Sequence, residues 1–155
     1  MLNLANTLKN SAEKLPSKVA IVHAEKSITY SELYEKARRF ANALKDLGIK
    51  PQDKVALISA NSVEWTTVYY GTLISGAVLV SMNFHLKSEE IAYQLKDSDT
   101  KIAVFSGDFK EQVVKGMNQA GVEKGIVLNG TPSGGLLAFD DLIAGASPEI
   151  GRAHV

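Results

Sequence analysis

Cysteine is absent from this 155-residue sequence. Without thiols the chain can form no disulfide, no cysteine nucleophile and no thiolate metal ligand, so a packed core has to supply its stability. The absence fits a reducing compartment. Residues 1–6 also lack a basic segment followed by an apolar core, so no secretory signal is indicated. We therefore expect a cytoplasmic protein.

A surplus of charge of one sign is missing as well. Lys and Arg together number 17, Asp and Glu also number 17, and the formal net charge is +0. A chain without a net field has no general attraction for nucleic acid or for an anionic membrane. We expect no nucleic-acid partner.

Sequence motifs that carry catalysis are scarce. The histidines His23, His85 and His154 are scattered along the chain, which argues against a metal site. No serine occupies a Gly-x-Ser-x-Gly elbow, and neither the dinucleotide fingerprint nor the Walker phosphate loop is present. We predict no catalytic residue and no metal ligand, and the cofactor-binding positions stay unknown.

Three segments only superficially suggest a site. Gly130–Gly135 has the glycine content of a phosphate-binding loop, but it contains no lysine and no strong helix follows it, so a plain surface loop is favoured. The acidic pairs Glu89–Glu90 and Asp140–Asp141 fit the first turns of helices, where the helix dipole stabilises negative charge.

The middle of the chain has the pattern of a strand–helix–strand unit. Lys54–Ser59 and Ala77–Ser81 are short apolar runs, typical of strands buried on both faces. Between them, Asn61 with Glu64 three residues later predicts a capped helix start, and this helix reaches about Ser75. We expect a right-handed βαβ unit with parallel strands.

The same region allows a membrane interpretation. Residues 65–84 contain no charged residue and are long enough to span a bilayer. Threonine, tyrosine, glycine and serine dilute the apolar character, however, and basic flanks are missing on one side. We favour a buried helix and strand over a transmembrane segment, and place Trp65, Val68, Tyr69 and Thr72 on one face of the helix.

The flanking sequence completes a layered fold. Lys18–Val22 and Ile28–Thr29, joined by a turn, predict a small antiparallel hairpin. The remaining patterns predict helices over 1–15, 29–47 and 88–96, a helix opening at Asp108, strands over 101–105 and 125–128, and a last turn or short helix within 136–144. The predicted fold class is α/β: a layered, mostly parallel sheet with helices on both faces, plus the small N-terminal hairpin.

Polar residues follow the first two predicted sheet strands. In open parallel sheets, ligands approach the carboxyl ends of the strands. The expected site-facing edge therefore consists of Ser59, Asn61, Ser81, Asn83 and His85. Capping and turn formation by these side chains is the favoured interpretation, and direct ligand contact is the alternative.

A series of short motifs carries a family resemblance. Each motif is weak alone, but their order and spacing together are specific. The series resembles the amino-terminal part of the adenylate-forming (AMP-binding) superfamily, in particular acyl-CoA synthetases (fatty acid–CoA ligases), over residues 2–128. The motifs are Thr29–Leu33, Ala43–Ile49, Pro51–Leu57, Asn61–Trp65, Gly76–Val80, Asn83 and Glu90–Ser98.

The sequence departs from the family pattern at several positions. Ser81 stands where many relatives have proline, Lys87–Ser88 where they have Thr-Pro, and His85 where related ligases often carry arginine. Ser88 is expected to cap the following helix in place of the usual threonine. No Pro-Leu-Asp-Pro stretch follows Val80, which argues against the adenylation domains of peptide synthetases.

The resemblance implies a two-step reaction. A carboxylate, here a fatty acid, attacks the α-phosphate of ATP in the presence of Mg²⁺, and the CoA thiol then displaces AMP from the acyl-adenylate. Such chemistry needs backbone amides and a lysine around the phosphates. In the family these groups belong to a phosphate loop, later nucleotide motifs and a carboxy-terminal lid, all outside the matched motifs.

The expected domain organisation follows from this resemblance. Residues 1–147 are predicted to be an incomplete, amino-terminal portion of a larger ligase domain, truncated before the phosphate loop and inactive alone. ATP, Mg²⁺ and CoA would serve the full-length enzyme without binding tightly here. The expected partners are the missing remainder of the same polypeptide and a small-molecule carboxylic acid.

The last residues receive a separate interpretation. Residues 148–155 are predicted to be a disordered tail. A back-translation of Glu149–Val155 resembles a short-read sequencing adapter, so we interpret the segment from about residue 149 as a read-through artefact without function.

Two other functions fit the composition and pattern. A self-sufficient α/β ligand-binding or interaction module without catalysis would share this layout, and a membrane-associated protein would use the uncharged central run. Extending the reading frame would distinguish the ligase from the stand-alone module, because in a ligase a Thr-Ser-Gly-Thr-Thr-Gly-like loop would follow soon after residue 150.

Overall fold

A five-stranded parallel sheet forms the centre of the computed structural model, which describes residues 3–150. The strand order is β4-β3-β5-β6-β7, and every neighbouring pair is parallel. The predicted α/β class and the parallel pairing of the central unit are confirmed. The strands are β3 (Lys54–Ile58), β4 (Val78–Met82), β5 (Thr100–Phe105), β6 (Lys124–Val127) and β7 (Leu137–Ala138).

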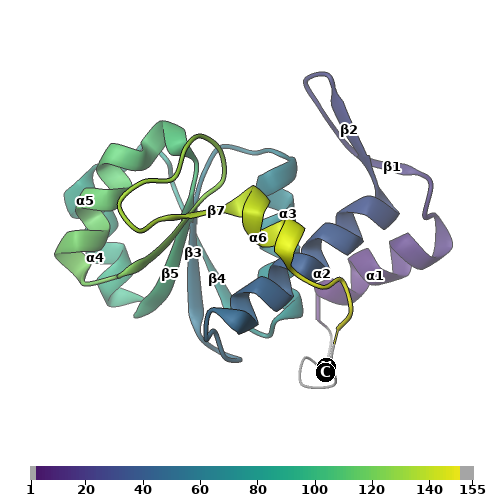
Figure 1. The fold of residues 1–155 in the computed structure, drawn as a ribbon, viewed down its shortest axis with the longest axis horizontal. Coiled ribbons are helices and arrows are strands. Elements are labelled where there is room, and N and C mark those ends of the chain that lie inside the picture. Colours follow the sequence, from purple (N-terminus) through teal and green to yellow (C-terminus); the bar gives the residue numbers. More distant parts are fainter. Residues whose placement is uncertain (1–2, 151–155) are drawn as a thin grey trace.

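Helices cover both faces of this sheet (Figure 1). Helices α2, α3 and α6 lie on one face, and α4 and α5 lie on the other. A short 3-10 turn, η1 (Gly107–Phe109), precedes α5. The helices are α1 (Ala5–Lys14), α2 (Tyr30–Asp46), α3 (Val63–Ile74), α4 (Ser88–Asp97), α5 (Lys110–Ala120) and α6 (Phe139–Gly145).

Alternation along β3 supplies both layers of the core. Val55 and Leu57 belong to the cluster under α2, α3 and α6, whereas Ala56 and Ile58 belong to the cluster under α4 and α5. All four are fully buried. Successive side chains of a strand point to opposite faces, so a strand covered on both sides needs an unbroken apolar run.

A smaller unit lies beside the main body. Strands β1 (Val19–His23) and β2 (Lys26–Thr29) form the predicted antiparallel hairpin, which projects from the body in Figure 1. Leu8 of α1 and Ile28 of β2 pack with Leu33 of α2 in a third apolar cluster. The hairpin is therefore attached through α2, and α1 through both α2 and α3.

The structure corrects three predicted helix starts. Ser62, not Asn61, caps α3, since its Oγ accepts from the Trp65 N–H at 3.0 Å. Ser88 lies inside α4, and its N–H instead donates to Gln112 Oε1 of α5 at 2.9 Å. Asp108 does not open α5, because η1 intervenes. The contact of Ser88 with Gln112 joins two helices and cannot be read from local spacing, whereas the Ser62 cap and η1 are local features that the sequence reading misplaced by a residue or two.

Two further segments differ from or extend the prediction. The sequence predicted only a turn or helix within 136–144, but Leu137 and Ala138 pair with β6 before α6 begins. A two-residue strand is too short to show an alternating pattern. At the predicted tail, residues 148–150 are described and Asn42 Nδ2 donates to the Ser147 and Glu149 carbonyls at 2.6 and 2.7 Å. Residues 151–155 lie outside the described part, His154 among them.

The uncharged central run does not form a membrane helix. Within residues 3–150, no helix combines the length and the apolarity needed to cross a bilayer. The run is instead divided among α3, a turn at Gly76 and the edge strand β4.

Helices α2 and α3 approach closely at Gly71. A Cβ added there would lie 2.8 Å from the Ala37 carbonyl oxygen and 2.9 Å from Phe40 Cβ. We expect Gly71→Ala to lower the free energy of unfolding by about 1–3 kcal/mol, because the backbone carbonyl cannot move aside. Urea denaturation measures the change. Gly145→Ala is the matched control, since no atom lies within 4 Å of its added Cβ; equal losses would contradict the close-approach explanation.

The predicted capping box at the start of α2 is confirmed. Thr29 Oγ1 accepts from the Glu32 N–H at 3.2 Å, and the Thr29 N–H donates to Glu32 Oε1 at 3.1 Å. Hydrogen bonding with the Thr29 side chain, and then with its backbone, lowers the pKa of Glu32 below its ordinary value of 4.5. The folded state therefore favours ionised Glu32.

This lowered pKa predicts a pH-dependent stability. The contribution of ionised Glu32 is complete above pH 4.5 and is lost as the pH falls through the lowered folded value. Wild type should exceed Glu32→Gln in free energy of unfolding at pH 7, with a smaller difference at pH 3, by chemical denaturation. In a Thr29→Val background the pH-dependent part should shrink. A difference that is the same at both pH values would disprove this role.

Candidate functional site

A cleft of about 750 Å³ lies at the carboxyl edge of the sheet. The ends of β3, β5 and β6 form its floor, the start of α3 forms one side, and the β1–β2 hairpin forms another. This is the edge where open parallel sheets bind ligands. Its lining consists of His23–Lys26, Ser59–Glu64, Ser106, Asp108, Leu128 and Asn129.

An amide side chain joins two strand ends within the cleft. Asn129 Oδ1 accepts from the Gly107 N–H at 2.7 Å and from Ser106 Oγ at 3.1 Å. Ser106 Oγ in turn accepts from the Asp108 N–H at 3.3 Å. A Cβ on Gly107 would meet the Asn129 carbonyl at 2.5 Å, so only glycine fits this approach. The segment after β5 is thereby fixed to the segment after β6.

The structure brings together only part of the predicted site edge. Ser59 and Asn61 line the cleft. Ser81 instead lies exposed within β4, while Asn83 Oδ1 accepts from the His85 N–H at 2.8 Å in a turn. The His85 ring contacts Phe84, with 4.4 Å between ring centroids, and lines a separate hollow of about 250 Å³. For Asn83, the favoured interpretation of turn formation is therefore the one that the structure shows.

Sequence reasoning missed two parts of the cleft. Ser106 and Asn129 each follow a buried strand, and this position was the available signal for including them. The hairpin side, from His23 to Lys26, had no such signal, because only the tertiary fold brings it over the sheet edge.

The charges of the cleft do not suit a nucleotide. Its lining holds three carboxylates, those of Glu25, Glu64 and Asp108, but the only ammonium group is that of Lys26. A triphosphate would meet net negative charge here, and the Gly107 N–H already donates to Asn129. The described residues also contain no group of three or more His, Asp or Glu side chains that could hold a metal ion. The charges of this cleft therefore do not fit the triphosphate of ATP.

The glycine-rich loop gains a lysine from elsewhere in the chain. Lys110 Nζ, at the start of α5, hydrogen-bonds Ser133 Oγ within the Gly130–Gly135 segment. The backbone φ is positive at Gly130, Gly134 and Gly135, so the loop needs these glycines for its path. The short strand β7 follows the loop.

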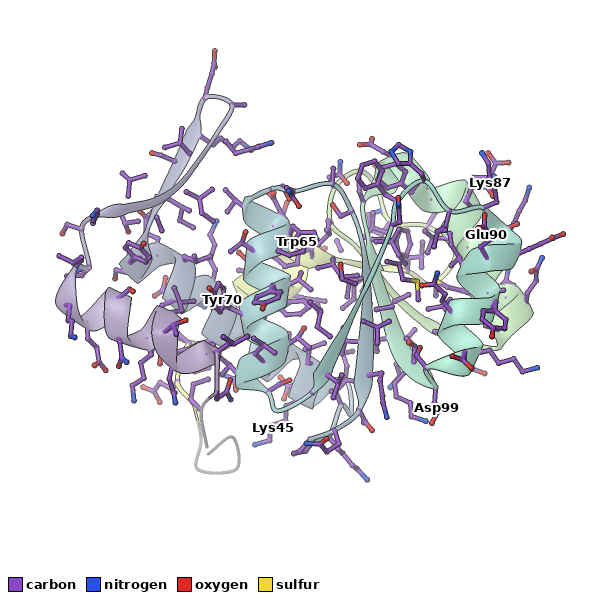
Figure 2. All side chains as sticks on the ribbon, turned by 180° about the vertical axis from the view of Figure 1, so that it is seen from behind. Lys45, Trp65, Tyr70, Lys87, Glu90 and Asp99 are labelled. Carbon is purple, nitrogen blue, oxygen red and sulfur yellow. The ribbon has the colours of Figure 1, made fainter. Side chains whose placement is uncertain are left out.

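A second hollow, of about 550 Å³, lies at the opposite, amino edge of the sheet. Lysines and carboxylates alternate around it, and two of the lysines are engaged locally. Lys124 Nζ donates to the Leu47 carbonyl at 2.5 Å, and Lys101 lies 3.5 Å from the carboxylate of Asp99, which is labelled in Figure 2. Its position and its mixed charge do not favour a ligand site.

These observations define a layered α/β protein: its sheet is parallel and open, helices cover both faces, and its carboxyl edge is polar. The family model described as "AMP-binding enzyme" matches residues 8–146. The chain belongs to this family, which confirms the resemblance seen in its motifs.

Named relatives and solved structures agree with this assignment. A medium/long-chain-fatty-acid–CoA/3-oxocholest-4-en-26-oate–CoA ligase of Mycolicibacterium smegmatis is 34% identical over 112 residues, covering 72% of this chain. A benzoate CoA ligase from Burkholderia xenovorans LB400 is 31% identical with a TM-score of 0.87, and an anthranilate CoA ligase in complex with anthranoyl-AMP is 25% identical with a TM-score of 0.92. Each structural match covers 96% of this chain.

The chain spans only a small part of these proteins. It covers 20% of the Mycolicibacterium ligase and 29% of each of the two solved ligases. The described residues are therefore one portion of a ligase fold.

The amide bridge at the cleft gives a testable expectation. Asn129→Ala should lower the free energy of unfolding by about 1 kcal/mol, because it removes the acceptor of two hydrogen bonds. The Gly107 amide should also exchange its hydrogen faster, as followed by NMR. Asn118→Ala, at an exposed position of α5, is the control: it should leave the Gly107 exchange rate unchanged and, through helix propensity, raise the free energy of unfolding by no more than about 0.7 kcal/mol. An unchanged Gly107 exchange rate would refute the bridging role.

Proposed function

We propose that this chain is the amino-terminal portion of an ATP-dependent acid–CoA ligase that activates a fatty acid as its acyl-adenylate and transfers it to CoA. The carrying observation is the family match over residues 8–146 in a chain that covers only 20–29% of its ligase relatives. We further propose that it acts in the cytoplasm.

Within that ligase, the described residues serve as framework. The net negative charge of the cleft supports this role, because phosphate-binding cations have to come from elsewhere. The remainder of the polypeptide would supply the phosphate loop, the later nucleotide motifs and the lid lysine. The isolated chain is accordingly inactive and binds ATP, Mg²⁺ and CoA no more than weakly.

The class of acid is proposed from the relatives' names. The Mycolicibacterium relative is named for medium- and long-chain fatty acids, which supports a fatty acid. The two solved ligases are named for benzoate and anthranilate, so an aromatic acid is the competing substrate class.

The domain boundary is part of the same proposal. Residues 1–147 are ligase sequence, and the segment from about residue 149 does not belong to it. Genomic sequence past Ser147 tests this boundary. A different sequence there, leading into a Thr/Ser/Gly-rich phosphate loop, is the expected result; Glu149–Val155 in the genome would contradict the adapter interpretation.

Adenylation by the full-length protein is the decisive activity. The polypeptide from the complete gene should catalyse ATP–pyrophosphate exchange with decanoate or palmitate, and more slowly with benzoate. Chain 1–155 should catalyse none under the same conditions. Full-length polypeptide heated to unfold it gives the background rate.

Two results would overturn the proposal. Exchange by chain 1–155 above background would refute its role as inactive framework. Faster exchange with benzoate than with either fatty acid would replace the fatty acid by an aromatic acid.

A further inference from the structure

Asn129 and Gly130 form the one Asn-Gly sequence of the chain. Asparagine is a chemically labile residue, because the backbone nitrogen of the next residue is able to attack its side-chain carbonyl carbon. Every other residue type in the next position carries a Cβ that obstructs this attack, and glycine has none. The pair follows β6 and borders the cleft at the carboxyl edge of the sheet.

The fold leaves the backbone at Gly130 unobstructed. Both Asn129 and Gly130 are exposed. Gly130 has a φ of +88°, and a Cβ placed on it would find no atom within 4 Å. The residue also begins the glycine-rich loop, in which Gly134 and Gly135 have positive φ as well. The peptide group of Gly130 therefore has room to approach the side chain of Asn129.

The hydrogen bonds of Asn129 involve the atom on which charge develops during such an attack. Its Oδ1 accepts from the Gly107 N–H at 2.7 Å and from Ser106 Oγ at 3.1 Å. Attack on the side-chain carbon turns this oxygen into an oxyanion, and donors that already point at it stabilise the transition state. The amide nitrogen, which has to leave, forms neither of these two bonds.

We propose that Asn129–Gly130 is a site of spontaneous deamidation, and that the isoaspartate formed there breaks the bridge between the segments after β5 and β6. The Gly130 nitrogen forms a bond to Asn129 Cγ, and the Cγ–Nδ2 bond breaks. The side-chain nitrogen leaves as ammonia with the proton that the Gly130 nitrogen gives up. Water then opens the five-membered imide: cleavage at Cγ gives aspartate, and cleavage at the backbone carbonyl gives isoaspartate.

The two products differ in their effect on the bridge. Aspartate keeps an oxygen in the place of Oδ1, so Gly107 and Ser106 retain their acceptor. Isoaspartate adds a methylene group to the main chain and shortens the side group, so the acceptor moves away from both donors. Either product adds a carboxylate to a cleft whose lining already contains those of Glu25, Glu64 and Asp108. Because the reaction needs only the folded chain and water, it is independent of the proposed ligase activity.

Peptide mass mapping of an aged sample tests the site. The polypeptide encoded by the complete gene is incubated at physiological pH and temperature, and its peptides are followed over weeks. The peptide with Asn129 should gain the mass of one amide-to-acid exchange at least about tenfold faster than the peptide with Asn61, because Ser62 carries a Cβ. Asn61 is the internal control, since it is exposed and lines the same cleft.

Two variants of Asn129 separate the chemistry from its structural effect. Asn129→Gln keeps an amide but would have to close a six-membered ring, so it should stay unmodified over the same time. Asn129→Asp supplies the charge without the isoaspartate backbone. Followed by NMR, the Gly107 amide should exchange its hydrogen at least about fivefold faster in the isoaspartate form than in fresh wild type, because it loses its acceptor. In Asn129→Asp it should remain as slow as in fresh wild type.

Three outcomes would overturn the inference. Deamidation of Asn129 no faster than that of Asn61 would mean that the bridge keeps the reacting groups apart. Unchanged Gly107 exchange in the purified isoaspartate form would show that the bridge survives the modification. Equally fast exchange in Asn129→Asp and in the isoaspartate form would assign the effect to charge instead of the altered backbone.

Discussion

The two-sided burial of β3 is the constraint on which the rest of this structure depends. β3 pairs with β4 on one side and β5 on the other, and Val55, Ala56, Leu57 and Ile58 alternate between two apolar clusters. Such a strand is stable only if helices cover both faces, so α2 with α3 and α4 with α5 are required together. On one of these faces, Gly71 lets α3 pack closely against α2.

The carboxyl edge of the sheet results from the same parallel geometry. Most of its polar groups are already used in hydrogen bonds within the protein. Parallel strands end together, so Ser59, Ser106 and Asn129 meet beneath the hairpin. Most of their polar groups satisfy one another or nearby backbone, and the surrounding carboxylates outnumber the lysine. The proposed framework role is consistent with both observations, since a structural edge needs satisfied hydrogen bonds and has no need for phosphate-binding cations.

Coverage of the ligase relatives explains features that would be unusual in a self-contained domain. A helix as apolar as α3 is normally buried on all sides, and an edge strand as uncharged as β4 is normally paired or covered. In the AMP-binding family to which the chain belongs, most of the relatives' length lies outside the matched residues. The uncharged, partly buried face of α3 and the uncharged edge strand β4 therefore fit a chain that covers only part of a longer ligase fold.

The sequence by itself determined the element types and the family. Continuous apolar runs identified β3, β5 and β6, the Thr29–Glu32 box identified the start of α2, and the order of motifs identified the AMP-binding enzymes, because each signal is local or depends only on spacing. Tertiary structure alone decided four other contacts. Gln112 accepts a hydrogen bond from Ser88 at the start of α4, and Asn129 accepts one from Gly107. Lys110 hydrogen-bonds the glycine-rich loop, and Leu137–Ala138 pair with β6 as a strand. Those contacts join residues distant in sequence, and their partners are set by how the layers pack.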